Sequence, residues 1–137
     1  MSEQTEQILK WLEKADHDLG TAIITYKHIP KYRDTIAFHC QQAVEKYLKT
    51  YLLKLGTEII KTHDLVYLFE IINKKESIES SWFNKLAMLQ EYSVEIRYPD
   101  QQIELSDEDI NHALQIANEV REFVVGKIGI NYPFSIE

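Results

Sequence analysis

Apolar residues recur every three or four positions along most of the chain, which is the spacing of amphipathic helices. The first such run covers residues 2–27, and Pro30 lies just beyond it, where it stops any continuation of the helix. A second helix is predicted over residues 34–55, because Asp34 is a favoured N-cap residue and Gly56 favours a helix end.

Three further helices are predicted in the second half of the chain. A short one opens at residue 62 or 63 and extends to residue 72, and a longer one covers residues 82–96. The last begins at Ser106 and ends at Gly126. Asp109 follows Ser106 by three positions, which is close to a capping-box pattern at the start of this helix.

These elements predict an all-α protein, an antiparallel up-and-down helical bundle of four longer helices plus one short helix. The chain has 137 residues, which suits one domain with one core, and only four Gly and three Pro, which disfavours a turn-rich β-sandwich. We assign residues 1–125 to the bundle and residues 126–137, with two of the four glycines, to a non-helical C-terminal tail.

Charge and cysteine content narrow the function classes. The net charge is −7, with nine Lys/Arg against eight Asp/Glu in residues 1–61 and six against fourteen in residues 62–137. A whole-molecule attraction to nucleic acid is therefore disfavoured, and any such site must be local. A single cysteine, Cys40, fits a reducing compartment, and no apolar run approaches a membrane span, so we expect a cytoplasmic protein that does not enter the membrane.

The second helix has an unusual polar face. At 100° per residue its apolar residues fall within an arc of about 140°, and its polar residues gather within roughly 80° on the opposite side. The polar set is His39, Gln42, Lys46 and Lys49. A solvated stripe is the ordinary explanation. However, Glu occurs only once in this helix, and Phe38 and Leu53 lie beside the polar set, which favours a face partly covered by another helix or a second subunit.

A second candidate lies in the stretch "VEIRYPD" of residues 94–100, where Arg97 is followed by Tyr98 and a proline. An arginine at the end of a helix has a structural explanation, because it caps carbonyls and complements the helix dipole. It is equally a residue that holds phosphate. Metal and cofactor sites are not predicted: the pattern H-E-x-x-H and a phosphate-binding Gly-rich loop are absent, and "DHD" at 16–18 points its residues in different directions.

Four segments carry a resemblance to a known family. They are "KADHDLGTA" in the first helix, "AFHCQQAVEKYLKTYLL" in the second, "KTHDLVYL" opening the third and "EYSVEIRYPD" closing the fourth. Together they resemble the HEPN family, the higher-eukaryote and prokaryote nucleotide-binding domain, over roughly residues 8–125. The resemblance implies an antiparallel helical bundle that usually dimerises. It also implies a frequent partner, a minimal nucleotidyltransferase, in two-component and often toxin–antitoxin systems.

Many HEPN domains are metal-independent RNases whose signature is Arg, four to six residues, then His. Arg97 matches the Arg, but no His follows it up to residue 104, and Gln102 stands where the nearest one would fall. The family's general acid/base is therefore missing from its usual place. Arg33 and His39 have the required spacing at the front of the second helix, which we interpret as coincidence. Whether His39 replaces the lost histidine stays open.

Two hypotheses follow. The first is a dimeric module that binds nucleotide, RNA or a nucleotidyltransferase partner. The second is an endoribonuclease that uses Arg97 together with His39. In both, the polar face of the second helix is expected to line a cleft with Arg97. This cleft is expected to bind phosphate, because Arg, Lys and a charged His are natural phosphate partners. The predicted ligand-binding residues are His39, Gln42, Lys46, Lys49, Arg97 and Tyr98.

Overall fold

A computed structural model describes residues 2–92 and 104–136 of the chain. Within them lie three long helices and two short ones, with no strand, which confirms the all-α prediction. The elements are α1 (Glu3–His28), α2 (Arg33–Lys54), α3 (Leu65–Lys75), α4 (Ser81–Tyr92) and α5 (Asp107–Ile128). The fourth helix was predicted to reach residue 96, and the part of that prediction beyond Tyr92 lies outside the described residues.

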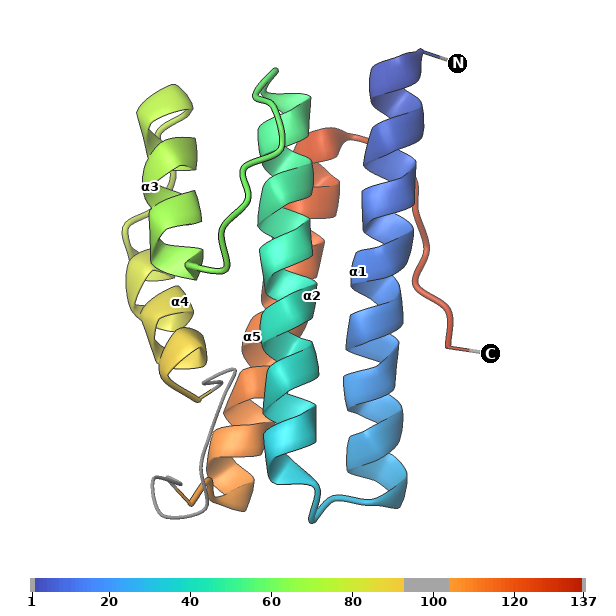
Figure 1. Cartoon of the computed structure of the whole chain (residues 1–137), viewed down its shortest axis with the longest axis vertical. Helices are drawn as coiled ribbons and strands as arrows, with labels where there is room; N and C mark the ends of the chain where they lie inside the picture. Colours follow the sequence, from blue (N-terminus) through green and yellow to red (C-terminus); the bar gives the residue numbers. More distant parts are fainter. Residues whose placement is uncertain (1, 93–103, 137) are drawn as a thin grey trace.

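Helix α2 is the centre of the bundle and packs against the four other helices. Figure 1 shows α1 antiparallel to α2, whereas α5 runs in the same direction as α2 on its other side. The connection over residues 55–64 returns along α2, so α3 also starts near the middle of the bundle and runs in that direction, and α4 reverses it. Helices therefore cover α2 on more than one side. The face that Figure 1 turns toward the viewer lies between α1 and the returning connection.

The apolar spacing in the sequence identifies the core correctly. In α1, the five predicted residues from Ile8 to Ala22 are at most 2% exposed, and Ile23 and Tyr26 pack against the core at its edge. In α2, the predicted apolar arc is buried apart from Leu55, which is half-buried. The buried members are Ile36, Ala37, Cys40, Ala43, Val44, Tyr47, Leu48 and Tyr51.

One predicted helix start is confirmed and another prediction is wrong. Ser106 caps α5, and its side chain and that of Asp109 exchange the two hydrogen bonds of a capping box. Asp34 is not the N-cap of α2. That position is held by Tyr32, which makes no side-chain capping bond, and Asp34 lies in the first turn, where its carboxylate complements the positive end of the helix dipole.

Two other boundaries differ from the sequence prediction. Helix α3 begins at Leu65 rather than at residue 62 or 63, because Asp64 is the N-cap and accepts a hydrogen bond from the Tyr67 backbone N–H. Helix α5 continues through Gly126 and ends at a left-handed residue, Gly129, with φ +76°. The non-helical tail therefore begins at residue 129 instead of residue 126.

A buried polar network fastens three helices and this tail together. The Asp16 carboxylate of α1 accepts two hydrogen bonds from Arg121 of α5, at 2.9 and 3.1 Å, and one from the Tyr47 hydroxyl of α2 at 2.5 Å. Arg121 also donates to the Tyr132 carbonyl at 2.7 Å, and its guanidinium lies 5.1 Å from the centre of the Phe134 ring. Buried charges are tolerated when they are paired and hydrogen-bonded, as they are here.

We predict that Tyr47→Ala destabilises the protein by about 2–5 kcal/mol, because it leaves a cavity in the core. Tyr47→Phe keeps the ring and removes only the bond to Asp16, and is expected to cost about 1–3 kcal/mol. Urea unfolding followed by circular dichroism measures both. Equal losses for the two variants would contradict the assignment of the ring to the core.

Burial raises the pKa of the Cys40 thiol from 9.0 to about 12, so the folded state favours the protonated form. The associated stability is complete below pH 9 and is lost as the pH rises from about 9 to about 12. We predict that the melting temperature of the wild type falls more steeply between about pH 9 and 11 than that of Cys40→Ala. Parallel curves for the two proteins would show that the thiol does not titrate in this way.

Candidate functional site

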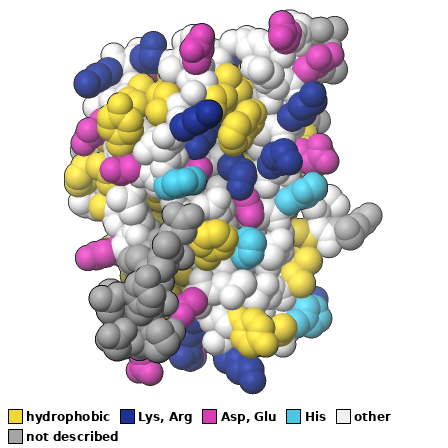
Figure 2. Space-filling view, viewed as in Figure 1, with side chains coloured by type: hydrophobic (Ala, Val, Ile, Leu, Met, Phe, Trp, Pro, Cys, Tyr) yellow, Lys and Arg dark blue, Asp and Glu magenta, His cyan; other side chains and the backbone are white. Residues whose placement is uncertain are grey.

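The four ligand-binding residues predicted on the second helix lie on one face of α2. We call His39, Gln42, Lys46 and Lys49 the polar strip. Figure 2 shows Lys, Arg and His side chains gathered over α1 and α2 on this side of the molecule, with a few acidic side chains among them. The other two predicted residues, Arg97 and Tyr98, lie outside the described residues, so their relation to the strip is not part of this geometry.

One end of the strip is built around a carboxylate from α1. The two oxygens of Asp18 have different partners: Oδ1 lies 3.0 Å from His39 Nδ1, and Oδ2 lies 2.5 Å from Lys46 Nζ. All three side chains are partly exposed, at 17–25%. In a neutral His39 this bond places the proton on Nδ1, which leaves the lone pair on Nε2.

A similar arrangement lies further along α2. Glu45 bonds Lys49 Nζ through Oε2 and His63 Nδ1 through Oε1, both at 2.9 Å. Glu45 and Lys49 are almost fully buried, with side chains 5% and 6% exposed, whereas His63 is 66% exposed. Gln41 supports this cluster by donating to the His63 carbonyl. At each end of the strip, one carboxylate is therefore bonded to one lysine and one histidine.

Sequence reasoning missed the partners in both clusters. Asp18 belongs to α1 and His63 to the connection before α3, and only the tertiary fold brings them to α2. A signal was available, since both lie in segments that carry the family resemblance, "KADHDLGTA" and "KTHDLVYL". Glu45 is in α2 itself, but its position at the edge of the polar face did not distinguish it from an ordinary solvated residue.

The strip is covered in part by its own chain. Lys49 Nζ lies 6.0 Å from the centre of the Trp11 ring of α1, and Leu53 is only 7% exposed. Leu53, which suggested contact with another helix or subunit, is thus buried within one chain. Phe38 is half-buried and contacts the His39 ring edge-on. The prediction that the polar face is partly covered is confirmed, with α1 providing the cover.

Arg33 and His39 have separate partners despite their motif-like spacing. Arg33 pairs with Asp107 of α5 at 2.6 Å, whereas His39 pairs with Asp18 of α1. The motif-like spacing of Arg33 and His39 therefore does not bring the two side chains into one site, which agrees with its interpretation as coincidence. Cys40 faces the core, and its raised pKa keeps the thiol protonated and unreactive at neutral pH.

The "DHD" residues of α1 point in three directions, as the helical spacing predicted. Asp16 faces Arg121 in the interior, His17 is exposed, and Asp18 faces the polar strip. In the described part of the chain, no three His, Cys, Asp or Glu side chains are grouped closely enough to hold a metal ion. None of the described helices is long and apolar enough to cross a membrane.

Comparisons with known proteins agree with this architecture. The family model "HEPN domain" matches residues 8–128. The crystal structure of TT1696 from Thermus thermophilus superposes with a TM-score of 0.74 at 24% identity, covering 88% of this chain and 98% of that one. That of ST0689, described as an archaeal HEPN homologue, gives 0.70 at 22% identity, covering 88% and 97%. No curated protein matches significantly. Because the family model spans most of the sequence, the chain belongs to the HEPN domain family.

Proposed function

We propose that this HEPN protein is a binding module that holds the phosphate groups of a nucleotide or of single-stranded RNA on the polar strip of α2. The observation that supports this most directly is the convergence of His39 and Lys46 on one partly exposed carboxylate, Asp18. Carboxylate and phosphate oxygens accept the same charge-assisted hydrogen bonds, so side chains arranged around the first are suited to the second.

The donors of the strip have capacity beyond their bonds to Asp18. A lysine ammonium carries three N–H donors, and the pair with Asp18 uses one of those of Lys46. The imidazole of His39 is held at Nδ1, and in the protonated ring Nε2–H is a second donor that can bond a phosphate oxygen. Both side chains remain partly exposed. A phosphate can therefore be bound beside the carboxylate without breaking the ion pair.

The formal charges of the two clusters cancel. Lys46 and Lys49 are balanced by Asp18 and Glu45, so these four groups have no net charge. The strip therefore offers a phosphate directed hydrogen-bond donors rather than a strong electrostatic field.

The proposal includes a homodimer and a minimal nucleotidyltransferase as partner, in a two-component system of the toxin–antitoxin kind. The family resemblance is the main support for both. Exposed apolar side chains on the described surface add to it, since a second copy or another protein would remove them from water. They include Ile24, Tyr32, Tyr67 and Phe83, each more than 40% exposed.

An endoribonuclease is a second candidate, favoured by the geometry of Asp18 and His39. A carboxylate bonded to Nδ1 orients the imidazole so that Nε2 can act as a general base. His39 would take the 2′-hydroxyl proton, the 2′-oxygen would bond to the adjacent phosphorus, and the 5′-oxygen would leave and take a proton from water. Lys46 would stabilise the charge on the phosphate.

We predict that Lys46→Gln weakens binding of a fluorescent single-stranded RNA and lowers the salt dependence of log Kd by about one. Asp18→Asn is expected to tighten binding, because it removes the negative charge beside Lys46. Fluorescence anisotropy measures both.

Lys85→Gln is the matched control for Lys46→Gln, because Lys85 also pairs with a partly exposed carboxylate, Glu119, but at the contact of α4 with α5. Its effect on binding should be small. Equal losses for the two lysine variants would mean that the protein attracts RNA without using the strip.

We predict that the purified protein does not cleave labelled RNA above background, because the motif histidine after Arg97 is missing. Gel electrophoresis of the reaction measures this directly. Cleavage that is abolished by both His39→Ala and Asp18→Asn would replace the binding module with the endoribonuclease. In that case Asp18→Asn would separate the two properties, since it should bind RNA tightly while cleaving it poorly.

A further inference from the structure

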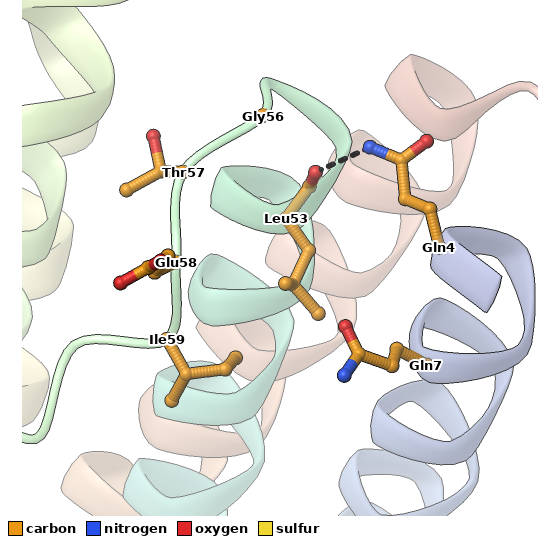
Figure 3. Close-up of a pocket in the computed structure, with 7 residues that line it drawn as sticks. All are labelled: Gln4, Gln7, Leu53, Gly56, Thr57, Glu58 and Ile59. Carbon is orange, nitrogen blue, oxygen red and sulfur yellow. Dashed lines mark hydrogen bonds between the residues drawn. The ribbon is translucent and has the colours of Figure 1, made fainter.

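A pocket of about 340 Å³ lies at the end of the α1–α2 face, beyond the polar strip. Figure 3 shows it between the first turns of α1, the last turn of α2 and the start of the connection that follows. The described residues that line it are Gln4, Gln7, Leu53, Gly56, Thr57, Glu58 and Ile59. This pocket takes no part in the phosphate binding proposed above.

The lining of the pocket is unsuited to an anion. Its described residues include no Lys, Arg or His, and their single formal charge is the carboxylate of Glu58. The side chains of Leu53 and Ile59 supply apolar surface, and two glutamines supply primary amides. Apolar walls with a few polar groups are the ordinary composition of a small-molecule site, and this lining suits a neutral ligand better than an anion.

The side-chain amides of Gln4 and Gln7 have different surroundings. Gln4 Nε2 donates to the Leu53 carbonyl at 2.9 Å, so this side chain closes the wall between α1 and α2. The amide of Gln7 lies one helical turn further along α1 and beside Leu53 (Figure 3). A glutamine amide offers one donor and one acceptor edge, the pair that matches the N6 and N7 atoms of adenine.

The pocket continues the polar strip along the same helices. Leu53 is one turn beyond Lys49 on α2, and Gln7 is one turn before Trp11 on α1. Between Lys46 and Leu53 the α2 axis rises about 10 Å, which spans about three steps of a stacked strand at about 3.4 Å each. Trp11 lies along this path, beside Lys49. In proteins that bind single-stranded nucleic acid, bases stack on aromatic side chains of this kind.

We infer that the pocket binds a nucleobase, adenine by preference, of an RNA strand whose phosphates lie on the polar strip. The inference rests on the proposed function, to which it adds the identity of the base. The Gln7 amide would read the adenine edge, and Leu53 and Ile59 would contact the faces of the ring.

The experiment compares a six-nucleotide oligoadenylate with an oligouridylate of equal length by fluorescence anisotropy. Wild type is expected to bind the oligoadenylate about tenfold more tightly, the size of one good amide–base pair. Gln7→Leu keeps the size of an exposed side chain and should reduce the oligoadenylate affinity to that of the oligouridylate. Gln115→Leu, at an exposed glutamine of α5, is the matched control and should keep the preference.

The outcomes separate the inference from the proposed function. If neither oligonucleotide binds, the phosphate-binding proposal fails and the inference fails with it. If both bind equally and Gln7→Leu changes nothing, the strip binds phosphate but the pocket does not read the base. As a direct check, titration with AMP should shift the side-chain amide NMR signals of Gln7. If those signals do not move during the titration, the pocket assignment is wrong.

Discussion

The register of α1 against α2 is the constraint on which the site depends. Asp16 fixes it, because its carboxylate is bonded to Tyr47 of α2 and Arg121 of α5 in the interior. Two residues correspond to about 200° around a helix, so fixing Asp16 inward places Asp18 on the other side of α1. There Asp18 meets His39 and Lys46. One buried ion pair therefore positions an exposed one, and the short sequence "DHD" encodes both.

The same network extends to the end of the chain. Arg121 bonds the backbone of the tail at Tyr132, and Ile136 packs over Gly20 of α1, where an added Cβ would lie 3.0 Å from the Ile136 side chain. Burial lowers the pKa of Arg121, but the hydrogen bond and charge of Asp16 outweigh that effect and raise it. The guanidinium is thus charged at every relevant pH, so the hydrogen-bond donor that joins α1, α5 and the tail is always present.

Much of the fold could be predicted because helical spacing depends only on local periodicity. The apolar sets of α1 and α2 match the buried residues, and the cap of α5 at Ser106 follows from side chains three positions apart. The errors occur where tertiary contacts determine the end of a helix. The stretch before α3 stays non-helical while Ile59 and Ile60 pack on the core and His63 bonds Glu45, so the helix starts later than its sequence suggests. Gly126 has no need for a left-handed conformation, whereas Gly129 adopts one and ends α5.

For the site, the helical spacing predicts the face but not its charge. His39, Lys46 and Lys49 were identified from their positions as a cationic surface, and the fold supplies a carboxylate to each end of it. These carboxylates lower the attraction for phosphate at neutral pH, yet they also hold flexible lysines and histidines in fixed positions. A preorganised site loses less conformational entropy when it binds. In a chain of net charge −7, ion pairs that cancel locally leave the strip little long-range attraction for an anion. Binding of an anion there would then depend on short-range contacts. For the proposed phosphate ligand, shape and hydrogen bonding at close range would therefore provide the discrimination.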